Sequence, residues 1–383
     1  MSSEIISKLV LEELTIQIVI EFQNRSFKPE DPILCKIPKT IRANHEKEYE
    51  PEIIAIGPYH RNGDHLGKIN PRLQFMEDMK LKFLIDLCIT TANKIEGVTK
   101  EDILKNITIA VQEKAIDAYK KYSESISFVT SYNKDFLKML ILDGSFIVQL
   151  FIEGGIPMKF TQNAHHSVKR DLLLFENQIP FFILETIYTC CFPTFNAMSF
   201  KGCALSYLQF PTFKDSHLEN PNIESVNHLL HLCHICIMYK SPEGTNEESE
   251  KLMTIPTASL LKEHGIQFRK KEDKRYGINS FLDISFKNGI IEIPHVVIED
   301  NTSSIYRNLL AFEQSSQTDH GNKFTHVNFM NDLIDTVDDV TLLTKTGILG
   351  NNLGSVDEVT KLFKEMCNYW LGVDRNHHYL VEV

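Results

Sequence analysis

The chain has 383 residues, of which 43% are hydrophobic and 24% charged, and this composition is typical of a globular protein with a sizeable core. Its net charge of −11 argues against a nucleic-acid-binding protein, which typically has a concentrated basic face. Its eight cysteines show no disulfide-framework spacing, which favours a reducing compartment. No run reaches the ~20 apolar residues of a membrane-spanning helix, and the N-terminus lacks a signal-peptide pattern. We therefore predict a soluble protein, cytoplasmic or peripheral to a membrane.

Helical periodicity dominates the first half of the chain. Residues 4–22 predict an amphipathic helix, whose apolar face Glu12 and Glu13 interrupt. That face contains Ile5, Leu9, Ile16 and Ile20. Residues 35–70, rich in Pro, Asn, Gly and His, predict extended segments and turns. Further helices are expected over 73–89, 100–122, 134–151 and 168–191. Pro180 should bend the last one, because proline lacks an N–H and leaves a carbonyl free.

The second half adds one strand signal to further helices. Asn288-Gly289 lies between alternating apolar runs and predicts a β-hairpin around 281–298. The polar, acidic residues 240–252 predict a mobile loop. Helices are expected over 224–238, from a cap near Thr257 to 263, and over 302–315, 324–345 and 354–370. The fold class is mainly α with a minor β component: a multi-helix domain with one small antiparallel hairpin.

These elements predict the domain organisation. Residues 1–34 form an N-terminal amphipathic helix and lead-in, 35–370 a single domain, and 371–383 a short tail. Two lobes on either side of 240–252 are an alternative division of the domain.

One helix concentrates side chains that are typical metal ligands: His228, His231, Cys233, His234 and Cys236. At 100° per residue their directions fall in different sectors, so one helix cannot make them converge on a zinc ion. Core and partly exposed helix positions are the better interpretation.

Two further patterns have a functional and a structural interpretation. Asp332, Asp335, Asp338 and Asp339 are either cation ligands or a solvated face. The glycine-rich run 347–355 suggests a phosphate-binding loop, but it has no Lys before Ser355. A connector ending in a capping box of Ser355 and Glu358 explains the same residues. The basic cluster 269–275 is interrupted by acidic residues and predicts a solvated loop. We predict no metal and no cofactor.

The most distinctive segment is 171–184, which places Glu176, Asn177 and Gln178 inside an apolar run before Pro180. Buried polar groups are costly unless each is hydrogen-bonded. Two interpretations remain: the three side chains satisfy backbone groups freed by Pro180, or Glu176 is an acid or base with a raised pKa. The sequence shows no second catalytic group and no hydrolase, zincin or dinucleotide motif. We therefore expect no enzymatic activity.

This segment resembles the Leu-Glu-Asn-Gln-x-Pro hallmark of the plant family called domain of unknown function 247, with Phe175 in place of the leucine. Other blocks from about 35 to 365 resemble that family in the same order, including Lys80 in the helix after 73. We take the following as its structural motif residues: Gly57, Pro58, Tyr59, His60, Met76, Glu77, Asp143, Gly144, Asp171, Glu176, Asn177, Gln178, Pro180, Arg307, Asn308, Glu313 and Gln314.

The resemblance implies a role rather than a reaction. The family's association with self-incompatibility and sex determination implies that the chain is a recognition or signalling protein in reproduction. Its partners would be unidentified proteins and not nucleic acid. An enzyme or small-ligand protein using the Glu176 region is the alternative. Relatives end in a hydrophobic anchor helix that this sequence does not show. We thus expect no stable membrane insertion. One alternative is that the chain competes with its membrane-anchored relatives. The other is that it is a truncated form of an anchored plasma-membrane protein.

Overall fold

The computed structural model describes residues 32–43, 45–61, 71–123, 134–154, 162–192, 199–208, 225–238, 255–271, 284–315 and 325–367. The predictions for 4–22, 240–252 and 371–383 lie outside these residues.

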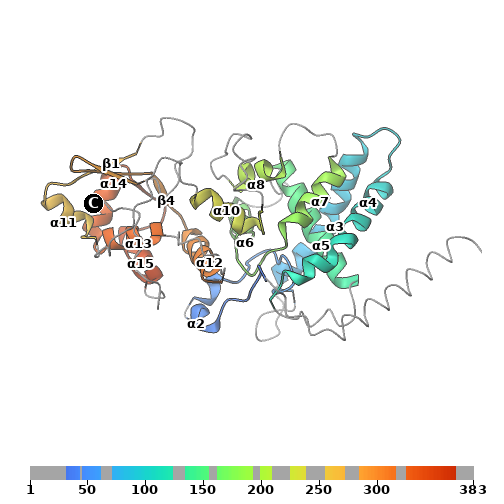
Figure 1. Ribbon diagram of the computed structural model, residues 1–383, viewed down its shortest axis with the longest axis horizontal. Coiled ribbons are helices and arrows are strands. Elements are labelled where there is room, and N and C mark those ends of the chain that lie inside the picture. Colours follow the sequence, from blue (N-terminus) through green and yellow to red (C-terminus); the bar gives the residue numbers. More distant parts are fainter. Residues whose placement is uncertain are drawn as a thin grey trace, which may run out of the picture.

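Four helices form a bundle at one end of the molecule (Figure 1). They are α3 (Pro71–Ala92), α4 (Lys100–Lys120), α5 (Lys134–Glu153) and α7 (Phe181–Cys191), and α8 (Phe200–Leu208) packs against α5. Helix α5 is buried along almost its whole length, from Phe136 to Phe151, as expected of a helix that is apolar on all sides. The bundle therefore has α5 at its centre.

A small residue lets α7 approach α5. A Cβ built on Gly144 would lie 2.4 Å from Ile187 Cδ1, well inside van der Waals contact. We expect Gly144→Ala to destabilise the protein by about 1–3 kcal/mol through overpacking. In the Ile187→Val background, which lacks that methyl group, the same change should cost almost nothing, because alanine favours a helix. A double-mutant cycle in urea measures this difference. Equal costs in both backgrounds would contradict it.

A middle layer joins the bundle to the C-terminal part (Figure 1). It contains α2 (Lys39–Arg42), the 3₁₀ turn η1 (Glu46–Glu48), α6 (Gln162–Asp171), α10 (Leu229–Met238) and α12 (Thr302–Ser315). Helix α12 contacts both η1 and α10. Apolar side chains from the bundle, this layer and the C-terminal part belong to one buried cluster.

The C-terminal part combines helices with two small sheets. Its helices are α11 (Ala258–Glu263), α13 (Thr325–Leu333), α14 (Val337–Lys345) and α15 (Val356–Cys367). In the first sheet, β3 (Ile290–Ile293) lies between parallel β1 (Gln267–Lys270) and antiparallel β2 (Ser285–Lys287). Asn288 and Gly289 have φ of 53° and 74°, the left-handed turn that Asn-Gly predicts, so the hairpin is confirmed.

Two elements of the C-terminal part differ from the prediction. Strand β4 (Val296–Ile298) leaves the hairpin and pairs in parallel with β5 (Leu349–Asn351), within the glycine-rich run. The helix predicted over 324–345 is two helices, because Thr336 begins α14 in a capping box with Asp339. The caps at Thr257 and at Ser355 with Glu358 are confirmed.

The helix predicted over 168–191 is also wrong. Helix α6 ends at Asp171, residues 172–180 are not helical, and Pro180 precedes the first residue of α7. Proline therefore starts a helix here instead of bending one, as its fixed φ and missing N–H allow. The fold class, mainly helical with a minor β component, is confirmed. The division of residues into domains stays a prediction.

Candidate functional site

Residues 172–180, between α6 and α7, carry the polar motif into the interior. Glu176, Asn177 and Gln178 are 5%, 1% and 2% exposed. Around them, residues 45–61 cross the molecule with only one turn of helix, so most of their backbone groups lack the regular partners of a helix or sheet. The side chains of the motif lie against this segment.

Asn177 and Gln178 bond entirely to backbone. Asn177 Oδ1 accepts from the N–H of Ile56 at 2.6 Å, and its amide nitrogen donates to the carbonyls of Ile54 and Asp171 at 2.9 and 2.8 Å. The Gln178 amide nitrogen donates to two carbonyls of its own loop, while Oε1 accepts from Leu230 N in α10. Both amides therefore replace bonds that a regular element would have made.

Glu176 has both carboxylate oxygens engaged. Oε1 accepts from the N–H of Ile37 at 2.5 Å, and Oε2 pairs with Arg42 at 2.7 Å. Arg42 also bonds Glu50. His60 lies between the two carboxylates, with Nδ1 3.1 Å from Glu50 and Nε2 3.7 Å from Glu176. The group forms a charge-paired cluster of two acids with Arg42 and His60.

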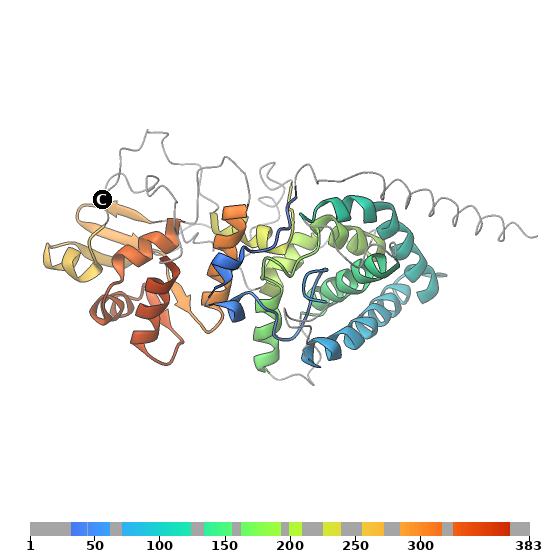
Figure 2. The ribbon, with the colours of Figure 1, turned by 90° about the horizontal axis from the view of Figure 1, so that it is seen from below.

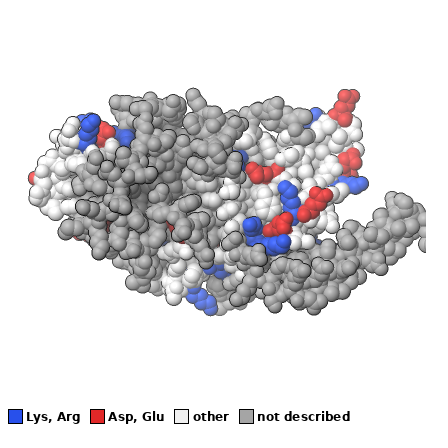
Figure 3. Space-filling model, in the orientation of Figure 1, with Lys and Arg blue, Asp and Glu red and all other residues white. Residues whose placement is uncertain are grey.

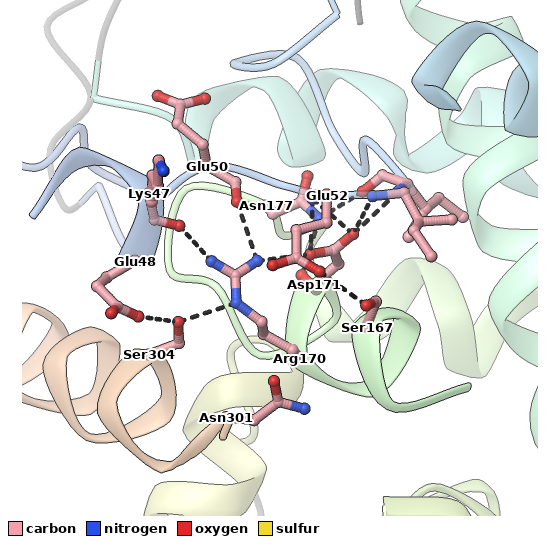
Figure 4. Close-up of polar contacts among 12 residues, drawn as sticks. Lys47, Glu48, Glu50, Glu52, Ser167, Arg170, Asp171, Asn177, Asn301 and Ser304 are labelled. Atoms are coloured by element: carbon pink, nitrogen blue, oxygen red, sulfur yellow. Dashed lines mark hydrogen bonds and ion pairs between the residues drawn. The ribbon is translucent and has the colours of Figure 1, made fainter. Parts of the chain in front are cut away.

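Asp171, at the end of α6, accepts hydrogen bonds from successive backbone N–H groups. Those of Ile53 and Ile54 reach Oδ2 at 2.7 and 3.0 Å, and that of Glu52 lies 3.0 Å from Oδ1 (Figure 4). Arg170 lies 2.9 Å from the same carboxylate. Burial raises the pKa of Asp171 to about 6, against the opposing effect of the backbone bonds and Arg170.

Arg170 connects α6 to η1 and α12. Its guanidinium donates to the carbonyls of Lys47 and Glu50 and to Ser304 Oγ (Figure 4). Asn308, one turn beyond Ser304 in α12, accepts from Phe175 N and donates to Glu48 O. Residues far apart in the sequence thus converge on the 45–61 segment.

A second charged cluster lies in the bundle. Asp143 is fully buried in α5 and lies 2.7 Å from Lys80 Nζ and 2.5 Å from Arg61. Lys80 and Arg61 also both bond Glu77. Its other oxygen accepts from Gly57 N at 2.8 Å. Burial raises the pKa of Asp143, but the charges and hydrogen bonds of Arg61 and Lys80 outweigh this and hold that pKa below its usual value.

We call these two clusters with Asn177, Gln178, Arg170, Asp171, Ser304 and Asn308 the buried polar network. Its partners are mostly backbone groups of 37–61 and paired charges. The predicted structural role of the motif side chains therefore has a geometric basis, but the backbone groups they bond lie mainly in other segments, not beside Pro180.

The remaining motif residues lie at varied places. Tyr59 donates to Leu34 O and packs edge-on against Tyr122, while Pro58 and Met76 are buried. Arg307 bonds Ser303 and lies 4.0 Å from Glu365. Glu313 is 2.6 Å from His234, whereas Gln314 is exposed. Arg307, Glu313 and Gln314 lie on α12 and are not members of the buried polar network.

The sequence did not single out Arg42, Glu50, Arg61, Arg170 or Ser304. The one available signal was Arg170 beside Asp171 at the start of an apolar run, where an unpaired charge would be costly. The others lie in polar surroundings in the sequence, so nothing local distinguishes them from solvated residues.

The metal-ligand patterns do not form sites. In the described ranges, no group of three or more His, Cys, Asp or Glu side chains is arranged to hold a metal ion. Cys233 and Cys236 are buried, and burial raises the pKa of Cys236 to about 12. Asp339 is buried, not solvated, and accepts from Ser259 N and Thr336, while Asp335 pairs with Lys364 at 2.9 Å.

The charge cluster at Glu50 predicts an acid sensitivity. Burial raises the pKa of Glu50, but hydrogen bonds and charges of His60 and Arg42 lower it to about 2. A folded-state pKa below the unfolded value contributes stability above about pH 4.5 that is lost as the pH falls toward 2. Because Glu50 is a third exposed, we expect the contribution to be on the order of 1–2 kcal/mol.

Urea unfolding from pH 7 to 2.5 measures this contribution as the difference between the parent protein and Glu50→Gln. The difference should be largest at pH 7 and fall to a small part of that value near pH 2.5. Asp171, whose pKa is raised to about 6, contributes stability that is lost as the pH rises from the usual aspartate pKa to about 6. This contribution is the same in both proteins and cancels in the difference. Glu96→Gln, at an exposed turn, is the control. A difference independent of pH would refute the assignment.

On the face seen in Figure 3, acidic and basic side chains of the described residues are interleaved over the bundle, with no patch of one sign. None of the described helices combines the length and apolar character needed to cross a bilayer.

Comparisons with known proteins identify the family. The chain is 28% identical over 361 residues to UPF0481 protein At3g47200 of Arabidopsis thaliana, covering 86% of this chain and 71% of that protein. It is 21% identical over 433 aligned positions to Putative UPF0481 protein At3g02645 of the same plant, covering 87% and 77%. No solved structure matches. The model of a family described as plant protein of unknown function, DUF247, matches residues 34–383, and the chain therefore belongs to that family.

Proposed function

We propose that this protein is a non-enzymatic recognition protein that works through protein partners. The observation that carries the proposal is the state of Glu176, the best candidate for a catalytic acid or base. Its two oxygens are bound by Ile37 N and Arg42, and the side chain is 5% exposed. A carboxylate in this setting supports the fold, and a general acid or base needs access to a substrate proton.

The buried polar network supports this role by holding the scaffold in one arrangement. It fixes the 45–61 segment against α5, α6 and α12, with long-range bonds such as Glu52 N to Asp171. Loops on a rigid scaffold make good recognition surfaces, because binding does not have to order the scaffold as well.

The polar residues 240–252 are the segment we assign to recognition. They lie in the sequence between α10 and α11, and both helices are held in place. His234 of α10 bonds Glu313 of α12 at 2.6 Å, and Ser259 of α11 donates to Asp339 at 2.7 Å. The family resemblance favours partners in floral tissue, and the composition of the sequence favours a cytoplasmic or membrane-peripheral location.

The test compares partner capture from floral extracts by the parent protein and by a variant with 240–252 replaced by a Gly/Ser sequence of equal length. A matched control replaces residues 124–133, which the proposal does not use. We expect the control to retain the specifically captured proteins and the 240–252 variant to lose them, with the same melting temperature for all three. Unchanged partners for the 240–252 variant would rule out this segment. Turnover of a substrate that Glu176→Gln abolishes would overturn the non-enzymatic role.

A further inference from the structure

Helix α3 lies at the outer edge of the bundle (Figure 2). It exposes a stripe of large apolar side chains. Phe75, Leu81, Ile85 and Ile89 are 53%, 52%, 45% and 39% exposed. At 100° per residue they fall within about 120° of one another, so they form one face. The opposite face, with Met76, Phe83 and Leu87, is buried. An amphipathic helix normally directs one apolar face inward and a polar face outward, so a second apolar face indicates a binding surface.

We propose that residues 4–22 of the same chain form an amphipathic helix that packs on this face of α3. The inference goes beyond the proposed function and uses none of its elements. It rests on three comparisons between the segment and the stripe: they lie within reach of each other, they have similar lengths, and they carry opposite charges at their centres.

The position follows from where the described chain begins. Leu34 N and Ile33 N donate to Lys121 O, just after the end of α4, at 2.9 and 3.0 Å. Residues 93–99 connect α3 to α4, and the two helices pack together as an antiparallel pair. The end of α4 therefore lies beside the start of α3. Residues 23–31 extend up to ~30 Å, which exceeds the ~10 Å spacing of packed helices.

The lengths match in an antiparallel arrangement. At 1.5 Å per residue, Ile5 to Ile20 spans ~22 Å and Phe75 to Ile89 spans ~21 Å. With residue 22 nearest the start of α3, Ile20 lies beside Phe75, and Ile5 lies beside Ile89. Leu9 then falls beside Ile85, so Phe75, Ile85 and Ile89 each meet an apolar position of the segment.

The charges match in the same register. Glu12 and Glu13 interrupt the apolar face of the segment at its centre. Lys82 is exposed at the centre of the α3 stripe, and opposite charges in these places offset part of the cost of burying either one alone. Asp78 lies within the stripe, four residues before Lys82, and falls opposite the neutral Gln17, whereas Asp86, at the edge of the stripe, meets Lys8. The acidic interruption thus has a basic counterpart.

The first test measures hydrogen exchange by mass spectrometry on the full chain. We expect the amides of 5–20 to exchange at least about tenfold more slowly than an unstructured segment. Leu81→Asp/Ile85→Asp should abolish this protection and leave that of α5 unchanged, since both positions are exposed. The control is Leu260→Asp, a 43%-exposed apolar residue on α11, which should leave 5–20 protected. Absent protection in the parent chain, or protection that survives Leu81→Asp/Ile85→Asp, would overturn the proposal.

The second test reverses charges. Lys82→Glu should weaken protection of 5–20, and adding Glu12→Lys and Glu13→Lys should restore it, whereas Lys138→Glu on the exposed side of α5 should have no effect. Failure of the restoration would overturn the register. Light scattering distinguishes the source of the contact: protection that rises with concentration together with a dimer mass would assign the face to a second copy and overturn the intramolecular contact. No partner protein enters these tests, so their outcome is independent of the proposed function.

Discussion

Asp143→Asn is expected to destabilise the protein by about 3–5 kcal/mol, because it leaves buried positive charge without its counter-charge. Lys80 is fully buried with Nζ 2.7 Å from Asp143, and Arg61 lies 2.5 Å from the same oxygen. Asparagine keeps an acceptor for Gly57 N but provides no charge. Glu77 then stands alone against two cations, and it is partly solvated. Urea unfolding at pH 7 measures the loss.

The matched control is Asp117→Asn, which removes the acid of an exposed pair with Lys120, 3.4 Å away in α4. Exposed pairs contribute 1 kcal/mol or less, so this change should be small. Lys80→Met in the Asp143→Asn background removes one of the unpaired cations and should recover part of the stability. If Asp143→Asn cost no more than Asp117→Asn, the bundle cluster would have to be solvated, contrary to its burial.

The helical character of the fold could be predicted because it has local causes. Residues 134–151 are apolar enough to form a central helix, and Asn288-Gly289 adopts the φ values that only such a turn favours. The prediction of one helix over 168–191 was wrong, because the helical spacing of apolar residues continues across a break in the helix when the chain is buried on both sides of that break. Leu172 to Leu174 are as apolar as a helix core, yet they belong to a non-helical segment.

The pairing of short strands with distant partners gave no signal. Val296 pairs with Leu349, and each of the two strands is only three residues long. A three-residue run cannot show an alternation, and the glycine-rich run that contains the second strand favours a loop. Only the packing of β4 against β5 decides their conformation.

Partners that are distant in the sequence also limited the prediction of the site. The polar motif was visible because three polar residues in an apolar run are unusual, and this much is a local property. Many of its partners are not local: Ile37 is 139 residues from Glu176, and Glu52 is 119 residues from Asp171. Most of the bonded groups are backbone N–H and carbonyl groups, which almost every residue has, so no side-chain pattern marks them.

Gly57→Ala is the second change with a large expected effect, because this glycine is needed twice. Its φ of +71° is unfavourable for alanine, and a Cβ would lie 2.4 Å from the carbonyl oxygen of Gln178. The obstacle is backbone held in the buried polar network, so it cannot move aside as a flexible side chain would. We expect a loss of about 3–4 kcal/mol, from ~1 kcal/mol of backbone strain and the rest from displacement of the loop.

Gly97→Ala separates the two causes. Gly97 has a similar φ, +77°, but a Cβ there meets nothing within 4 Å, so its substitution should cost only the ~1 kcal/mol of strain. The difference between the two free energies of unfolding measures the close approach of 54–57 to the motif. Equal losses would mean that the approach at Gln178 is not tight and that the motif segment tolerates movement. A larger loss at Gly57, together with faster amide exchange at Ile56, would show that the contact and the Asn177 hydrogen bond hold the same segment.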